Sequence, residues 1–161
     1  MVFDRHSHAR IYLLERGQGG LRSLGPAMPD GFSPGSREWS GSAVIDAATG
    51  IVTLYFTASG RRGEAAVTME QRIFRASARL ADDRLIAWQP AEEVIVADGH
   101  HYAVADQAAP VDGRIRGFRD PSLFRDPATG QRWMVFTGSS AAEPGHSDGV
   151  IGAALIDEQG T

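Results

Sequence analysis

An all-β fold built from repeated hairpins, as in a β-propeller or a similar array, is predicted by three features of this sequence. Glycine and proline are frequent, with 19 and 8 residues, and they separate short apolar runs. Those runs are rich in the β-branched and aromatic residues that favour strands. A hairpin-like segment at 42–59 recurs at 122–139. Repeated short strands are typical of propellers.

Each strand is expected where apolar residues alternate or run together between Gly, Pro or Asp residues. Segment 70–80 (EQRIFRASARL) is compatible with a strand or a helix, and we predict a strand because no capping pattern opens it. Loops rich in Gly, Pro or Ser are expected at 21–37 and 139–148. The expected strands are 10–16, 42–46, 51–58, 70–80, 122–125, 131–137 and 149–156.

The two copies of the hairpin share a turn. Asp46 to Gly50 (DAATG) matches Asp126 to Gly130 (DPATG). An initial aspartate and a final glycine are what a type I turn followed by a left-handed residue requires. Pro127 suits the second position, where φ lies near −65°. Both segments are therefore expected to form the same hairpin.

The length of 161 residues predicts one domain, 1–161, here a partial propeller. The repeat divides it into units of about 40–119 and 120–161, the second incomplete, or about two to three blades of four-stranded antiparallel sheet. Shared hairpin chemistry alone would produce part of the match, so chance similarity is the alternative to a true repeat.

Equivalent hairpins bring equivalent residues together. If 42–59 and 122–139 belong to neighbouring blades, Trp39 and Ser40 fall opposite Arg119 and Asp120. All four residues are then expected at the start of like strands, around one central pocket.

Composition excludes several function classes. The net charge is −4 and no basic cluster is present, which argues against nucleic acid or an anionic membrane as partner. There is no cysteine, so disulfides and thiolate metal sites are excluded. The first residues lack the pattern of a signal peptide, and no run approaches the roughly 18 apolar residues of a spanning helix. The cellular location stays open.

Arg119-Asp120-Pro121 is the sharpest chemical motif. Pro121 is expected to hold Asp120 in extended geometry, and Arg119 favours an ionised carboxylate beside it. An ionised aspartate suits hydrogen bonds from sugar hydroxyls and stabilisation of an oxocarbenium-like transition state. The alternative is a turn aspartate before a strand, with a solvated arginine.

Glu38-Trp39-Ser40-Gly41 is the second motif. An indole face packs on the apolar face of a sugar ring, and the Ser40 hydroxyl can bind a sugar oxygen beside it. Gly41 permits close approach of the backbone. The alternative is a core tryptophan at the head of a strand.

Together these motifs resemble glycoside hydrolase family 68, the levansucrases, inulosucrases and related β-fructofuranosidases. The resemblance covers nearly the whole chain, and the Arg-Asp-Pro tripeptide is shared with the invertase-like family 32. The segments that carry it, in order, are Asp4-Arg5-His6, His8-Ala9-Arg10-Ile11, 35–43 (GSREWSGSA) and Phe118-Arg119-Asp120-Pro121.

The resemblance implies a five-bladed propeller and retaining double displacement on sucrose, with fructose passing to water or to a growing fructan. An aspartate nucleophile, a glutamate acid/base and a transition-state stabiliser act in such enzymes. Carried over, Asp120 is the stabiliser and Arg119 its motif partner. Trp39 and Ser40 are substrate-binding residues. No cofactor is implied.

Two of the family's carboxylates have no counterpart here. The nucleophile belongs to a Trp-Asp motif upstream of the matching segments, and the acid/base belongs to a Glu-Arg motif downstream of Arg-Asp-Pro. Glu15-Arg16 lies far upstream of Arg-Asp-Pro and is interpreted as a strand end. Thr137 stands where family members often carry a glutamate. Both carboxylates are expected to be missing from this chain.

No metal site is predicted. The histidines are interpreted as solvated or locally hydrogen-bonded, because no third histidine or glutamate stands at a standard ligand spacing. Asp112 lies where some family members bind calcium, but no second ligand is identifiable. The histidines are His6, His8, His100, His101 and His146.

Three functions therefore compete. The first is a levansucrase-type enzyme represented by an incomplete or divergent chain, with sucrose and fructan as ligands. The second is a non-catalytic sugar-binding or remnant protein that keeps half of the pocket. The third is a propeller fragment that self-associates through open blade edges, because unpaired edges favour pairing.

Overall fold

The computed structural model describes residues 4–106, 114–142 and 148–157. Within these ranges the chain is antiparallel β-structure, with one short 3₁₀ helix, η1 (Asp4–Ser7). The all-β prediction is confirmed. No helix in the described ranges is long and apolar enough to cross a membrane. Asp112 and His146 lie outside the described residues.

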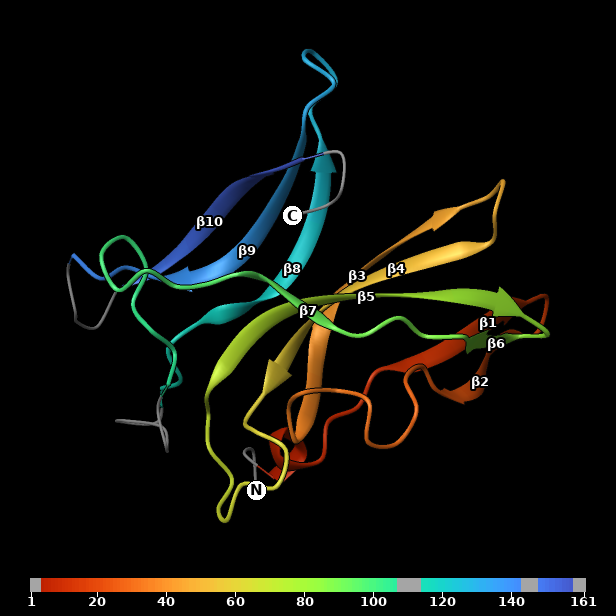
Figure 1. The fold of residues 1–161 in the computed structure, drawn as a ribbon, viewed down its shortest axis with the longest axis horizontal. Helices are drawn as coiled ribbons and strands as arrows, with labels where there is room; N and C mark the ends of the chain where they lie inside the picture. The colour runs from red at the N-terminus through yellow and green to blue at the C-terminus, as the bar shows by residue number, and fades with distance from the viewer. Residues whose placement is uncertain (1–3, 107–113, 143–147, 158–161) are drawn as a thin grey trace.

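The strands form three sheets (Figure 1). In the first, β1 (Tyr12–Gly17) pairs with β2 (Gly20–Pro26). The second runs β3 (Arg37–Asp46), β4 (Ile51–Ser59) and β5 (Gln71–Ala81). On the free side of β5, β6 (Arg84–Ile86) pairs with one part of the strand and β7 (Glu92–Ile95) with another. Together they occupy the place of a fourth strand. The third contains β8 (Phe118–Arg125), β9 (Arg132–Ser139) and β10 (Gly149–Ile156).

Two sequence-based boundaries are corrected by the structure. The loop expected at 21–37 is wrong in its first part, because β2 occupies Gly20–Pro26. Leu21 to Pro26 pair with β1 instead, after a hairpin turn in which Gly17 is paired to Gly20 across two residues. Strands β3 and β8 also begin several residues earlier than expected. Ser40 and Asp120 consequently lie inside strands rather than before them. The strand predicted at 70–80 is confirmed as β5.

Strand β4 lies at the centre of the second sheet, and its two faces serve two cores. Tyr55 faces a core shared with Phe118 and Phe136 of the third sheet. Leu54 and Phe56 face a second core. This alternation follows the two-residue period of a strand. Because both of its faces are packed in a core, β4 is a rigid support for neighbouring strands.

The two hairpin turns have the same hydrogen bonds, as the sequence predicted. The Gly50 N–H donates to the Asp46 carbonyl at 2.8 Å, and the Gly130 N–H donates to the Asp126 carbonyl at the same distance. Both glycines have positive φ, 72° and 74°. In each turn the aspartate carboxylate accepts hydrogen bonds from the residues two and three positions ahead. The boundaries of the repeat units stay a prediction.

Strand β10 is one edge of the third sheet, and it exposes apolar side chains. Ile151 is 77% exposed and Leu155 is 54% exposed. An exposed apolar edge strand can pair with a strand of a second chain, which is how self-association would occur. Self-association of this chain stays a prediction.

Candidate active site

Two β-bulges place the predicted pocket residues side by side. The β3–β4 register skips between Trp39 and Gly41, so Ser40 is the extra residue. The β8–β9 register skips between Arg119 and Ser122, around Asp120. Bulges re-aim side chains and are common near active sites. Here they turn the Ser40 hydroxyl toward Asp120, and it donates to Asp120 Oδ1 at 2.5 Å.

Gly41 makes the bulge in β3 sterically feasible. A Cβ at this position would lie 1.9 Å from the Tyr55 carbonyl oxygen and 2.8 Å from Phe56 Cα. No side chain fits there without moving the backbone of β4. The close approach expected from the sequence is therefore observed, and it fixes where Ser40 emerges.

The backbone of Asp120 differs from the prediction. Pro121 was expected to hold Asp120 in extended geometry, and this is wrong, because its φ is +59°. Left-handed φ is uncommon outside glycine, and aspartate tolerates it better than most residues. Such conformations persist where surrounding contacts hold them and cluster at active sites. Here the β-bulge in β8 accommodates the left-handed backbone of Asp120, and a hydrogen bond to Thr57 holds it.

Thr57 ties the two bulges together. Its hydroxyl accepts a hydrogen bond from the Asp120 N–H at 2.9 Å and donates to the Ser40 carbonyl at 3.1 Å. Thr57 is fully buried on the rigid strand β4. One hydroxyl thus fixes the backbone of both pocket residues. In the sequence, Thr57 stands out only because Thr137 occupies the matching position in the second hairpin.

A buried amide positions the arginine of the motif. Arg119 lies with its Nε 3.3 Å from Asp120 Oδ2 and donates from Nη1 to Gln71 Oε1 at 3.1 Å. The same Gln71 oxygen accepts the Phe118 N–H at 3.1 Å, and its Nε2 donates to the carbonyls of Met69 and Arg116. Gln71 therefore fastens the start of β8 to β5. No sequence pattern had indicated it.

Trp39 forms part of the wall of an open pocket of about 610 Å³. Its ring packs edge-on against His6 with centroids 5.4 Å apart, and its Nε1–H donates to the His6 carbonyl at 3.3 Å. Trp39 is also 8% exposed, so it serves the core and the pocket together. Among the residues that line the pocket are His6, Glu38, Trp39, Ser40, Arg119 and Asp120.

Glu38 brings a buried carboxylate to the pocket wall. Its Oε2 accepts the Ile11 N–H at 3.0 Å, and its Oε1 lies 3.7 Å from Arg10 Nε. Burial raises the pKa of the Glu38 carboxyl above its ordinary value, although the Ile11 hydrogen bond and Arg10 oppose the shift. Glu38 holds the segment before β1 against the start of β3.

This raised pKa predicts how stability changes with pH in the variant Glu38→Gln. A carboxyl whose pKa is higher in the folded protein stabilises it below the unfolded pKa, about 4.3, and this contribution is lost as pH rises. The free energy of unfolding of the wild type, minus that of Glu38→Gln, should therefore fall as the pH rises above about 4. Urea titrations at several pH values measure it. The exposed Glu15→Gln is the control, and a flat or rising difference for Glu38 contradicts the prediction.

All four predicted site residues are thus brought together, while their roles stay predictions. The geometry suits a polyhydroxyl ligand, because a carboxylate, a hydroxyl and an arginine face one cavity beside an aromatic wall. Thr137, the position where a family glutamate was expected, pairs with Arg119 in the β8–β9 register.

Comparison with known proteins gives the family. A model described as Levansucrase/Invertase, glycoside hydrolase family 68, matches residues 2–157. The chain belongs to this family. Levansucrase LscC from Pseudomonas savastanoi pv. glycinea is 32% identical over 154 residues, which is 95% of this chain and 33% of LscC. Levansucrase from Rahnella aquatilis is 31% identical over 147 residues, 88% of this chain and 32% of the relative.

Solved structures show the same fold. An inulosucrase from Halalkalicoccus jeotgali bound to kestose matches with a TM-score of 0.75 and 31% identity, over 96% of this chain and 41% of that one. A levansucrase variant from B. megaterium matches with a TM-score of 0.69 at 17% identity, over 94% and 46%. The chain spans about a third of the length of its curated relatives. The fold of a partial propeller is therefore confirmed.

Proposed function

We propose that this chain forms the fructosyl-binding side of a retaining levansucrase-type enzyme that acts on sucrose. The observation that supports this most is the hydrogen bond between Ser40 and Asp120 in a pocket walled by Trp39. Family membership and the kestose complex of the inulosucrase point to the same ligand class. In this proposal the ring of the fructosyl group lies against Trp39.

Asp120 stabilises the transition state in this proposal. As the glycosidic bond breaks, positive charge develops on the fructosyl ring, and a fixed carboxylate beside it lowers the barrier. Thr57 and Ser40 hold Asp120 before substrate binds, so little reorganisation is needed. Arg119 partly neutralises the negative charge of Asp120 at Oδ2, the oxygen that does not face Ser40.

The nucleophile and the acid/base are proposed to come from outside the motifs present in this chain. Retaining chemistry needs two carboxyl groups about 5 Å apart, and Asp120 fills neither role. The rest of such an enzyme, or a partner chain, would supply both groups. A non-catalytic sugar-binding protein is the second candidate, since the pocket half described here suffices for weak binding.

Sucrose binding by Ser40→Ala tests the proposal. Ser40 is exposed, so its loss should leave the fold intact while removing one hydrogen-bonding group and freeing Asp120 to turn. Calorimetry with the isolated chain should show sucrose affinity reduced about fivefold to tenfold, or roughly 1 kcal/mol. The control is Ser122→Ala, an exposed serine of β8 that does not line the pocket. Equal sucrose affinities for the wild type, Ser40→Ala and Ser122→Ala would show that Ser40 does not bind sucrose.

A further inference from the structure

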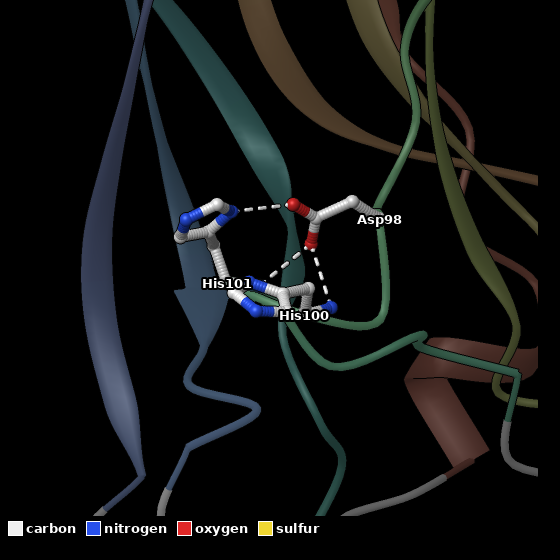
Figure 2. A group of neighbouring side chains, drawn as sticks. All are labelled: Asp98, His100 and His101. Atoms are coloured by element: carbon white, nitrogen blue, oxygen red, sulfur yellow. Dashed lines mark hydrogen bonds and ion pairs between the residues drawn. The ribbon is translucent and has the colours of Figure 1, made fainter.

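The segment between β7 and β8 gathers a carboxylate and two imidazoles in one exposed turn (Figure 2). Asp98, His100 and His101 each offer a ligand atom, and these atoms lie within 4.8 Å of one another. None of the three residues lines the pocket described above. The sequence-based interpretation of His100 and His101 does not include Asp98, so it misses the third group.

Hydrogen bonds within the turn define its backbone. Asp98 Oδ1 accepts three backbone hydrogen bonds, from His100 at 2.9 Å, His101 at 2.8 Å and Tyr102 at 3.1 Å. The Gly99 N–H closes the turn by donating to the Tyr102 carbonyl at 3.0 Å. Gly99 has a φ of 70°, which glycine adopts without strain. The side chains of the cluster therefore project from a defined backbone.

The turn is also fastened to the core. The Tyr102 ring packs against Phe136, with centroids 5.2 Å apart, and against Phe118 at 6.2 Å. The Ala141 N–H donates to the His101 carbonyl at 3.1 Å. Binding a ligand at this turn would consequently order little additional chain, which keeps the entropic cost of binding low.

The two oxygens of Asp98 have different tasks. Oδ1 holds the backbone of the turn, while Oδ2 lies 2.6 Å from His101 Nδ1. The His100 ring packs edge-on against the His101 ring at 4.6 Å between centroids. The hydrogen bond from His101, followed by those from backbone N–H groups, holds the pKa of the Asp98 carboxyl well below its usual range. Oδ2 is thus a charged oxygen beside two imidazoles, and the backbone turn does not need it.

We propose that Asp98, His100 and His101 bind a divalent transition-metal ion of the Zn²⁺ or Ni²⁺ type. The ion takes the place of the proton shared by His101 Nδ1 and Asp98 Oδ2, which is released, and His100 supplies the third ligand. Water fills the remaining positions of a site with three protein ligands. Two imidazoles and one carboxylate favour Zn²⁺, Ni²⁺ or Cu²⁺ over Ca²⁺ or Mg²⁺, which prefer oxygen ligands.

Titration of the metal-free chain with Zn²⁺, followed by calorimetry, tests the proposal. We expect one ion per chain with a micromolar dissociation constant, undisturbed by excess Ca²⁺ or Mg²⁺. His100→Ala and His101→Ala should each weaken binding about tenfold or more, and both side chains are exposed, so the fold should persist. Co²⁺ absorption spectra in the same variants give a second readout of ligand loss.

Asp98→Asn separates the metal site from the turn. Asparagine keeps an oxygen that accepts the three backbone N–H groups, so the turn should persist, but it removes the charge, so Zn²⁺ affinity should fall. The control is His8→Ala, an exposed histidine of another segment, which should bind Zn²⁺ as the wild type does. Absence of saturable binding, or equal affinity in the wild type and the three cluster variants, overturns the proposal.

Discussion

Replacing Asp120 by asparagine is expected to abolish sucrose turnover while leaving sucrose binding nearly unchanged. Asparagine keeps the size of the side chain and can still accept the Ser40 hydrogen bond, and it tolerates the positive φ of this position. It lacks the negative charge that stabilises the developing cation. Loss of such an electrostatic interaction should lower kcat by about 10³-fold and leave KM within about threefold.

The measurement is glucose release from sucrose by a chimera in which this chain replaces the corresponding third of a levansucrase relative, with and without the substitution. Asp126→Asn is the matched control, because it makes the same change in an exposed hairpin turn away from the pocket. If the chimera with Asp120→Asn turns over sucrose as fast as its parent, Asp120 has no catalytic role.

Gln71→Leu is expected to cause the largest loss of stability among the substitutions proposed here. Gln71 is 4% exposed and makes four hydrogen bonds, to the Phe118 N–H, the Arg119 guanidinium and the carbonyls of Met69 and Arg116. Leucine fills a similar volume but leaves these groups without their partner. Each buried unsatisfied group costs about 1–3 kcal/mol, so the free energy of unfolding should fall by about 3 kcal/mol or more.

Urea denaturation of the isolated chain measures this loss. The exposed Gln131→Leu, in the turn before β9, serves as control and should change the free energy of unfolding by less than about 0.5 kcal/mol. Because Gln71 also holds Arg119, we expect weaker sucrose binding by Gln71→Leu under conditions where it is folded. Equal stabilities of the two variants would show that β8 is positioned without this amide.

The sequence predicted the architecture well because the strands and turns depend on local chemistry. In each hairpin, the Asp-to-Gly turn and the two apolar runs that it joins lie within a few residues of one another in the sequence. The alignment of the two hairpins also indicated that Ser40 and Asp120 share a pocket. That inference needed only matching positions in two similar hairpins, and no knowledge of the sheets.

Two of the missed features depend on contacts between distant segments. The left-handed backbone of Asp120 arises from a bulge held by Thr57, which lies 63 residues earlier. Gln71 and Phe118 are 47 residues apart. A local rule for the residue before proline gave the wrong backbone for Asp120, because tertiary contacts outweigh local preference at this position. Asp98 was overlooked because its role follows from the shape of its turn.

A titration of the ¹⁵N-labelled chain with sucrose, followed by NMR, shows whether Trp39, Ser40 and Asp120 bind a fructoside. We expect chemical shifts to change at the backbone amides of Ser40 and Asp120 and at the Trp39 indole N–H. Signals from the hairpin turns and from the turn at 98–102 should stay in place. Saturable shifts confined to those pocket groups would support a fructoside site between β3 and β8. Changes elsewhere with none at Ser40 or Asp120, or no change at all, would contradict it.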